Sequence, residues 1–386
     1  PEVHYVLRPE DGVGAGFMMQ WLEGFTLGAQ IVKAPELAEI RPQLARRCGE
    51  VLAQIHGIDL VASGLDQHLQ HQSAEEYVRQ TWQRYQDFKT PQPMIDYTAR
   101  WLLDHLPENT TPALVHNDFR NGNVMVDPNG IVAVLDWEVA YMGDPMRDLG
   151  WILTHSWRFG RDHLPVGGFG EIADLLSGYE SVSGKPVDPE AVKFWQIFGS
   201  FWWAVGCLGM AEHYRNGPDK TVERPAVGRR SSECQVYCVN LLIPGSVALE
   251  QPETAAAAMP GMDELLTSVS DFLRDEVMTN TQGRLQFLAR VAANSLDIVQ
   301  REHALSAPCL LSEERRLRDL FNVPDDSSLA LDDLRWRLVH ELRDGSMPLD
   351  SELLQTHLRA TVVNQIAIDQ PRYAGFKSAM SEANTI

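Results

Sequence analysis

The chain has 386 residues, 44% of them apolar and 22% charged, and its 53 acidic and 33 basic residues give a net charge of −20. This length suits two or three folded domains, and the composition argues against a disordered chain. The acidic balance argues against general nucleic-acid binding and against a basic protein of membrane surfaces, because both depend on basic patches.

Short strands are predicted first, followed by helices with a β-rich segment between them. Alternating apolar residues at 3–7 and 17–22 flank a glycine-rich turn at 11–16. Apolar residues then recur at helical spacing over 36–57. The other elements expected before residue 245 are helices at 74–87, 95–106, 145–157, 170–182, 189–213 and 230–242, and the β-rich segment at 113–138.

The longest uncharged run, 194–211, just reaches the length of a membrane span. It contains Gln196, Ser200 and three glycines, so a buried core helix is the preferred interpretation. The five cysteines complete no zinc site and indicate reduced thiols, and no signal peptide is evident. A cytoplasmic protein is therefore expected.

The composition changes after residue 243. Residues 246–261 are rich in proline, glycine and alanine and are predicted to be a linker. The helices predicted after it lie at 262–305 with a break near 280–283, at 311–321 with 331–344, and at 349–368. They indicate an all-α accessory domain over 262–386.

A β-hairpin is predicted to carry the chemistry. Residues 127–130 read Asp-Pro-Asn-Gly, a β-turn signal flanked by apolar strands. If the two ends of this turn pair, Asn123 opposes Val134 and shares a face with Asp136, while Asp118 lies in the loop that enters the hairpin. Two carboxylates and one amide thus converge, a ligand set that suits Mg²⁺ and phosphate better than zinc.

The motifs of this segment resemble those of a known family. HNDFRNGN at 116–123 matches the kinase catalytic-loop pattern H-x-D-x-x-x-x-N, and DWE at 136–138 stands where kinases have D-F-G. With GDPMRDL at 143–149, the run resembles the aminoglycoside phosphotransferase and choline kinase-like family, most closely the phosphotransferase domains associated with acyl-CoA dehydrogenases. The resemblance covers residues 1 to about 245 and implies an α+β fold: a mostly helical, protein kinase-like catalytic lobe with a β-hairpin catalytic segment, followed here by the C-terminal all-α domain.

The resemblance also implies the roles of the main site residues. Asp118 is the expected catalytic base, or the group that positions the acceptor hydroxyl. Asn123 and Asp136 are the expected Mg²⁺ ligands, with ATP as phosphate donor. Backbone groups around Gln20 and Leu22, in the hinge between the lobes, would bind adenine, and an ordinary edge strand is the alternative.

Neighbouring residues have more structural expectations. His116 is expected to hold the catalytic loop and Asp148 to brace it without direct chemistry. Asp144 and Pro145 are typical of a helix start. Arg120 either contacts phosphate or is a solvated surface arginine.

Aromatic and acidic side chains complete the candidates. Five tryptophans are expected to be mainly core residues, with the lining of an acceptor pocket as the alternative: Trp151, Trp157, Trp195, Trp202 and Trp203. His56 is expected to have a packing role, and Glu23 and Glu138 are candidates to contact a cationic acceptor.

The sequence departs from the family pattern before the hinge. A complete nucleotide lobe has a glycine-rich loop over the phosphates and a strand lysine, and no lysine precedes Lys33 here. We expect that the chain carries the catalytic lobe without most of the nucleotide lobe, and that it is a weak or inactive fragment of an active parent protein. The expected domain limits are 1–24 for the N-lobe remnant and hinge, 25–245 for the catalytic lobe, 246–261 for the linker and 262–386 for the helical domain.

These features predict an ATP-dependent phosphotransferase acting on a hydroxyl of a small molecule. Aminoglycoside, choline-like, sugar and hydroxyacyl-CoA acceptors stay open. One alternative is a pseudokinase-like binding or scaffold protein acting through its helical domain, which resembles an uncharacterised domain appended to such phosphotransferases. A protein kinase is the third interpretation, disfavoured because DWE replaces D-F-G. A homo-oligomer or an acyl-CoA enzyme partner stays open, and no nucleic acid or membrane partner is expected.

Overall fold

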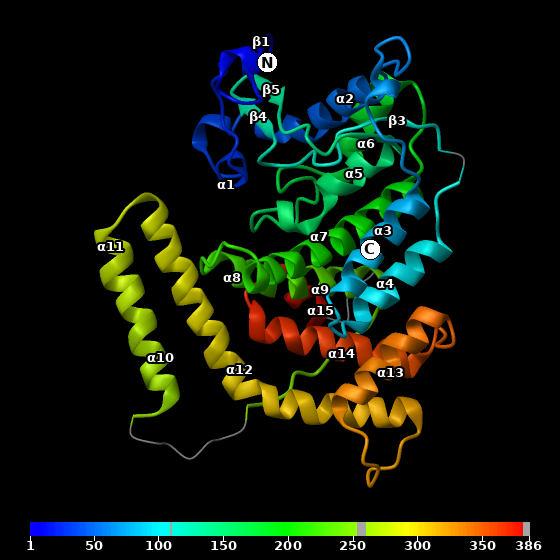
Figure 1. Cartoon of the computed structure of the whole chain (residues 1–386), viewed down its shortest axis with the longest axis vertical. Coiled ribbons are helices and arrows are strands. Elements are labelled where there is room, and N and C mark those ends of the chain that lie inside the picture. Colours follow the sequence, from blue (N-terminus) through cyan, green and yellow to red (C-terminus); the bar gives the residue numbers. More distant parts are fainter. Residues whose placement is uncertain (109, 253–259, 381–386) are drawn as a thin grey trace. The chain divides into compact units, whose positions relative to one another are not determined.

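The computed structural model describes residues 1–108, 110–252 and 260–380 (Figure 1). The chain divides into two compact units. The first consists of Pro1–Ala74 and Pro107–Gln196, and the second of Glu75–Leu106 and Ile197–Ile386.

The first unit combines short strands with helices. Its strands pair as three separate two-stranded antiparallel sheets, β1 with β2, β3 with β6 and β4 with β5. The elements are β1 (Val3–Val6), β2 (Phe17–Met19), α1 (Gly28–Ile31), α2 (Leu44–His56), β3 (Ala113–Val115), β4 (Val124–Asp127), β5 (Gly130–Val134), β6 (Tyr141–Gly143), α5 (Met146–Leu153), α6 (Ile172–Ser183) and the start of α7 (Pro189–Asn216).

The helix predicted over 36–57 begins later than expected. Residues Pro35–Leu37 and Arg41–Gln43 form 3₁₀ turns, and α2 starts only at Leu44. Pro42 explains the delay, because proline has no N–H to donate to a carbonyl of the preceding turn. The prediction of a continuous helix is therefore wrong for 36–43.

Helices α2 and α6 cross at very short range in the core of the first unit. A Cβ built on Gly49 would lie 2.0 Å from the carbonyl oxygen of Leu175, and one on Gly178 would lie 2.1 Å from that of Arg46. The two glycines therefore let the backbones approach where any side chain would collide. Leu52 and Tyr179 are buried in the same core.

The predicted hairpin forms, but with a shifted register. Asp127 pairs with Gly130, and the amides of Asn129 and Gly130 donate to the Asp127 carboxylate at 2.7 and 3.0 Å. An irregularity between Met125 and Val126 then shifts the pairing by one residue, so Val124 rather than Asn123 opposes Val134. The predicted Asn123–Val134 pairing is wrong, because a bulge places an extra residue in one strand.

The second unit is helical. The helix predicted at 74–87 is α3, and the one predicted at 331–344 is α13. The elements are α3 (Ala74–Asp87), α4 (Pro93–Asp104), the rest of α7, α8 (Glu223–Arg229), α9 (Ser231–Leu242), α10 (Met262–Asp271), a π-helical turn (Phe272–Val277), α11 (Met278–Asn280), α12 (Gly283–Phe321), α13 (Leu331–Asp344), α14 (Glu352–Asp369) and α15 (Ala374–Met380).

The C-terminal helices differ from the prediction in their continuity. The expected break near 280–283 is present, and α10 then lies beside the first half of α12 (Figure 1). However, α12 continues for 39 residues through Pro308, whereas two helices were predicted there. Helices α8 and α15 were not predicted.

The core of the second unit joins segments from both sides of the predicted linker. Met94 and Val239, from α4 and α9, are buried with Leu338 and Leu358 of α13 and α14. The two compact units therefore divide the chain at other positions than the predicted domain limits, 25–245 and 262–386. Those limits stay predictions. Some residues of the predicted linker, 253–259, lie outside the described ranges.

Two further expectations concern single features. Uncharged residues 194–211 lie within α7, and among the described helices none has the length and apolar character needed to span a bilayer. All five cysteines are free thiols, and four of them are buried.

Candidate active site

The start of the predicted catalytic loop is fixed by a buried carboxylate. Asp148 of α5 accepts hydrogen bonds from the backbone amides of His116 and Asn117, at 2.8 and 2.7 Å, and lies 3.1 Å from the imidazole Nε2 of His56. Burial alone would raise the pKa of Asp148, but the hydrogen bond from His56 and the electrostatic interaction with that imidazole outweigh it and lower this pKa. Asp148 thus braces the loop, as predicted, and His56 supports it beyond simple packing.

The loop then turns through a left-handed residue. Asn117 has a φ of 69°, a conformation that asparagine tolerates better than most residues. Its side-chain oxygen accepts from Nε of the buried Arg147 at 3.1 Å, and its amide nitrogen donates to the carbonyl of Val139 at 3.1 Å. These bonds set the direction in which the next residue, Asp118, projects.

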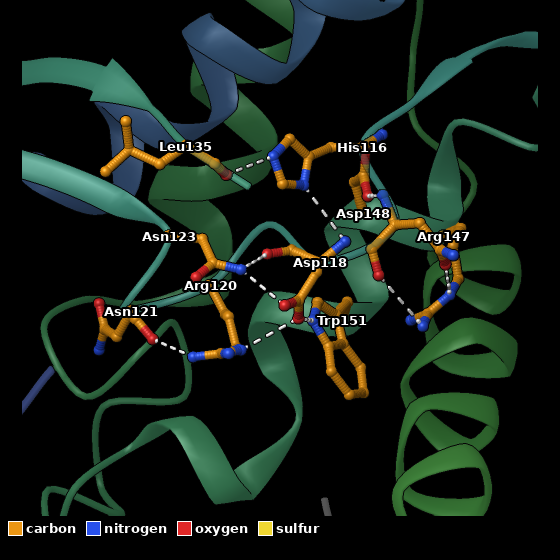
Figure 2. Close-up of polar contacts among 10 residues, drawn as sticks. His116, Asp118, Arg120, Asn121, Asn123, Leu135, Arg147, Asp148 and Trp151 are labelled. Carbon is orange, nitrogen blue, oxygen red and sulfur yellow. Dashed lines mark hydrogen bonds and ion pairs between the residues drawn. The ribbon is translucent and has the colours of Figure 1, made fainter. Parts of the chain in front are cut away.

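Three side-chain donors hold the Asp118 carboxylate (Figure 2). Its Oδ1 accepts from the indole Nε1 of Trp151 at 2.8 Å and from Nε of Arg120 at 3.0 Å. Its Oδ2 accepts from Nδ2 of Asn123 at 2.6 Å, and the same Nδ2 also donates to the backbone carbonyl of Asp118 at 3.0 Å. The structure therefore brings two of the predicted site residues, Asp118 and Asn123, into direct contact.

His116 ties the loop to the end of the hairpin. Its Nε2 lies 2.9 Å from the carbonyl oxygen of Leu135, and its Nδ1 lies 3.2 Å from the amide nitrogen of Asp118. Because a carbonyl only accepts and an amide N–H only donates, Nε2 carries the proton and Nδ1 accepts. His116 thus has the structural role that was predicted.

Asp136 is the next residue after Leu135, whose carbonyl accepts the hydrogen bond from His116. It has a φ of 67° and an exposed side chain, and its carboxylate bonds to no residue in the described ranges. The preceding residue, Leu135, donates its amide to the Asn123 carbonyl at 2.7 Å. Asp136 is thus the residue after Leu135, which is hydrogen-bonded to the backbone of Asn123. No hydrogen bond joins the Asp136 side chain to Asp118 or Asn123.

The predicted hinge segment is attached to the same hairpin. Phe25 exchanges two backbone hydrogen bonds with Val126, at 2.7 and 3.0 Å. Gln20 uses its amide to bond the Glu2 carbonyl at 2.8 Å, and Leu22 is half-buried in the irregular stretch between β2 and α1. The two predicted adenine-binding positions therefore lie in a segment attached to the strand that begins next to Asn123.

Asp144 lies one residue outside the expected N-cap position, because Pro145 is the N-cap of α5. Its Oδ1 accepts from the amide of Met146 at 2.9 Å at the start of α5, and its Oδ2 accepts from the indole Nε1 of Trp195 at 2.7 Å. Burial raises the pKa of Asp144, against the hydrogen bonds from Trp195 and Met146. Asp144 therefore positions α5, the helix that carries both Asp148 and Trp151.

Arg120 was predicted either to contact phosphate or to be a solvated surface arginine, and its surroundings match neither description fully. Its guanidinium pairs with Asp118, donates through Nη1 to the carbonyl of Asn121 at 2.9 Å and lies 4.4 Å from the ring centre of Trp157. It is thus a partly exposed group with defined contacts, directly beside the candidate base. Asn121, in turn, donates to the carbonyls of Trp157 and Gly167 and joins the loop to that segment.

Sequence reasoning missed the contact between Trp151 and Asp118. Trp151 was grouped with the core aromatics, and it is indeed buried, but its N–H reaches the candidate base. Glu23 and Glu138 are both exposed, without a site contact that would define a role. No cluster of three or more histidine, cysteine, aspartate or glutamate residues suited to a metal occurs in the described part of the chain.

A carboxylate held beside an asparagine, in a loop braced by a second aspartate and followed by a hairpin, defines a kinase-like catalytic segment. Residues 1–184 match the model of the phosphotransferase enzyme family, and residues 279–373 match a domain of unknown function, DUF6285. Residues 1–184 are thus similar to the phosphotransferase enzyme family. The expected α+β, kinase-like fold with a C-terminal helical region is confirmed.

Two acyl-CoA dehydrogenase family members match this chain over part of its length. Acyl-CoA dehydrogenase family member 10 of Mus musculus is 32% identical over 143 residues, which cover 35% of this chain and 13% of that protein. Acyl-CoA dehydrogenase family member 11 of Gallus gallus is 32% identical over 177 residues, 43% of this chain and 22% of that protein. The match thus spans less than a quarter of either relative.

Solved structures show a partial likeness. A putative aminoglycoside phosphotransferase from Ralstonia eutropha JMP134 is 25% identical, with a TM-score of 0.49, and the match covers 57% of this chain and 70% of that one. A choline/ethanolamine kinase family protein from Mesorhizobium loti is 18% identical, with a TM-score of 0.38, and the match covers 63% and 72% of the two chains.

Proposed function

We propose that this protein transfers the γ-phosphoryl group of ATP to a hydroxyl group of a small molecule. The observation that carries the proposal is the Asp118 carboxylate, fixed by Trp151, Arg120 and Asn123 in a loop with kinase spacing. Oδ1 accepts two hydrogen bonds and Oδ2 only one, and a carboxylate has about four acceptor positions. Oδ2 can therefore accept a bond from the acceptor hydroxyl.

In this proposal Asp118 aligns the hydroxyl and takes its proton. The hydroxyl oxygen forms the new bond to the γ-phosphorus as the bond to the departing ADP breaks, and the proton moves to Oδ2. The barrier falls mainly because the reacting groups are positioned and the developing charge is stabilised. Arg120, next to Asp118, would add positive charge near the transferred group.

The candidate Mg²⁺ ligands are Asn123 and Asp136. Asn123 bonds Asp118 through Nδ2, which leaves its amide oxygen for a cation, and the exposed Asp136 carboxylate is not bonded within the described residues. Oxygen donors of this kind fit Mg²⁺. When bound, Mg²⁺ would neutralise charge on the ATP phosphates.

The remaining assignments concern the two substrates. The backbone N–H of Gln20 already donates a hydrogen bond to the carbonyl of Glu2. Adenine would therefore bind to the backbone carbonyl of Gln20 and to the backbone of Leu22. Among the open acceptors, the relatives named as acyl-CoA dehydrogenase family members favour a hydroxyacyl thioester over an aminoglycoside or a choline-like alcohol.

Asp118→Asn provides the decisive test. We expect turnover of ATP with a mixture of small alcohols to fall by about 10²–10⁴-fold, because the base is lost, while ATP binding is unchanged. Asp66→Asn, which changes an exposed aspartate far from the loop in sequence, should keep full turnover. Full activity of Asp118→Asn would remove this residue from the mechanism.

A binding or scaffold protein is the second candidate. Four apolar side chains that recur at helical spacing from α10 into the π-helical turn are about half exposed: Met262, Leu265, Val269 and Phe272. Such a face is typical of an interaction surface. A rise in unfolding temperature with ATP that requires Mg²⁺ would favour the enzyme, and its absence would favour the scaffold.

A further inference from the structure

Two adjoining cavities lie within the second unit. The larger has a volume of about 330 Å³ and is bordered by the start of α4 and by residues of α9, α12, α13 and α14. The smaller, of about 160 Å³, shares four wall residues with it: Glu313, Arg335, Thr361 and Gln365. Their combined size is that of a small-molecule site.

The larger cavity contains a buried histidine without partners. His357 of α14 is only 1% exposed, and its Nδ1 is buried without a hydrogen-bond partner among the described residues. Buried polar side chains are nearly always hydrogen-bonded, because losing water without replacement costs free energy. His357, which lines the cavity, is therefore a polar group that a ligand could satisfy.

The ring is uncharged in the folded protein. Burial, together with the positive charges of Arg316 and Arg335, lowers the pKa of His357 to about 3. A neutral imidazole offers one N–H donor and one nitrogen acceptor. The ring therefore adds no charge to the cavity and offers the body of a bound molecule one donor and one acceptor.

The smaller cavity contains an arginine whose charge is not neutralised by contact. Arg316 of α12 is half-buried, its Nη1 and Nη2 bond only to the hydroxyls of Ser312 and Thr361, and its Nε is buried without a partner. Glu250 and Glu313 are near enough to act on its charge, but neither forms an ion pair with it within 4.0 Å in the described chain.

Arg335, unlike Arg316, forms an ion pair with a carboxylate. It pairs with both oxygens of the Glu313 carboxylate, at 2.7 and 2.6 Å, so the acidic group of the shared wall is balanced. Of the two guanidinium groups that border the cavities, one is neutralised and the other is not. A half-buried cation without a counter-ion favours binding of an anion.

We propose that the two cavities form one binding site for a small organic anion, with its acid group on Arg316 and its body beside His357. A carboxylate and a phosphate share this chemistry. Pro93, Met94 and Leu358 give the larger cavity apolar contacts for the body. Arg316 and His357 both lie within the 279–373 match, so the site gives the domain of unknown function a ligand-binding role.

Three probes that share one ring test the proposal: benzoate, phenyl phosphate and the uncharged benzamide. By calorimetry on the whole chain, we expect at least one of the two acids to bind with a Kd below about 1 mM and benzamide to bind at least tenfold more weakly. Which acid binds more tightly distinguishes carboxylate from phosphate. The proposal is overturned if neither acid binds, or if benzamide binds equally well.

Variants locate the binding. Arg316→Gln should weaken acid binding at least tenfold, and Arg316→Lys, which keeps the charge, should retain some of it. Arg337→Gln, which removes an exposed arginine paired with Glu341 on α13, should leave binding unchanged. Acid binding that survives Arg316→Gln would also overturn the proposal.

A spectroscopic measurement does not depend on whether the arginine variants fold. The ring signal of His357, assigned by its loss in His357→Gln, should shift when the tighter-binding acid is added. The ring signal of His105, which is stacked on Trp101 in α4, should not move. A stationary His357 signal under conditions where that acid binds would place the ligand elsewhere and contradict the proposal.

Discussion

Three aspartates in the described part of the chain, Asp96, Asp118 and Asp144, accept a hydrogen bond from a tryptophan indole in different surroundings. Trp82 donates to Asp96 at 2.7 Å and Trp195 to Asp144 at 2.7 Å, and burial raises the pKa of both carboxyls. Trp151 donates to Asp118 at 2.8 Å, where the carboxylate is partly exposed. The indole thus stabilises a buried acid twice and positions a candidate base once.

The Trp151→Phe variant tests this positioning role. It keeps an aromatic side chain in the core but removes the donor to Oδ1 of Asp118. A hydrogen bond to a charged group contributes about 1.5–3 kcal/mol, so we expect kcat to fall by roughly 10- to 100-fold. The KM for ATP should stay the same, because the donor acts on the base.

Trp82→Phe is the matched control. It removes the same kind of indole–carboxylate bond, but from Asp96, which is fully buried in the second unit. We expect Trp82→Phe to lower the unfolding temperature and to leave kcat unchanged. If both variants lowered kcat by the same factor, the effect at Trp151 would be one of general stability, and Trp151 would have no positioning role.

At the residue scale, local spacing was enough to predict some of the site. His116, Asp118 and Asn123 lie within eight residues, so one loop must bring them together. Trp151 is brought to Asp118 by α5, whose rotation depends on Asp144 and on packing against α7. Nothing in the spacing of Trp151 fixes that rotation, and the contact could not be read from the sequence.

At the scale of elements, helix periodicity predicted the existence of helices better than their ends. Ala74–Asp87 and Leu331–Asp344 agree with the prediction, while Pro42 delayed the start of α2 and α12 passed through Pro308. The hairpin turn was predictable from Asp-Pro-Asn-Gly. Its bulge was not, because no residue type marks the extra position, which is Val132 of β5, opposite the step from Met125 to Val126.

The crossing of α2 and α6 leads to a prediction for Gly49→Ala. Helix propensity alone would favour alanine by about 1 kcal/mol. However, the new Cβ would lie 2.0 Å from the backbone oxygen of Leu175, which cannot move without the helix. We expect the collision to prevail and urea unfolding to show a net loss of about 1–3 kcal/mol.

Gly209→Ala is the control for this variant. Gly209 is also inside a helix, α7, but the nearest atom to its added Cβ would be the end of the Arg84 side chain at 2.9 Å. A flexible side chain can move away, so helix propensity should decide, and we expect no change or a gain of up to about 1 kcal/mol. A gain of stability in Gly49→Ala as well would show that α2 and α6 pack less tightly than described.

At the scale of the whole molecule, the second unit joins segments that are far apart in sequence. Arg343 of α13 bonds the buried Asp96 of α4 at 2.8 Å across 247 residues, and Arg229 of α8 bonds Asp369 of α14 at 2.7 Å. The linker composition pointed to a boundary near 246–261. Composition reports only the local chain, so it could not show that α4 and α9 share a core with the helices that follow.

This shared core predicts that the C-terminal helices cannot be removed without damage. Without residues 261–386, a fragment of residues 1–250 would expose Met94, Tyr97, Val236 and Val239, which are now buried, and would leave Asp96 without Arg343. Burial of one such side chain contributes about 1.5–3 kcal/mol, so four contribute about 6–12 kcal/mol, which is comparable to the stability of a whole domain. We expect the 1–250 fragment alone to aggregate or to bind a hydrophobic dye.

Expressed together, the fragments 1–250 and 261–386 should purify as a one-to-one complex, because the missing core surface is restored in trans. A monomeric 1–250 fragment with a cooperative unfolding transition would instead support a domain boundary at the linker, and the packing of α4 and α9 on α13 and α14 would then contribute little to stability.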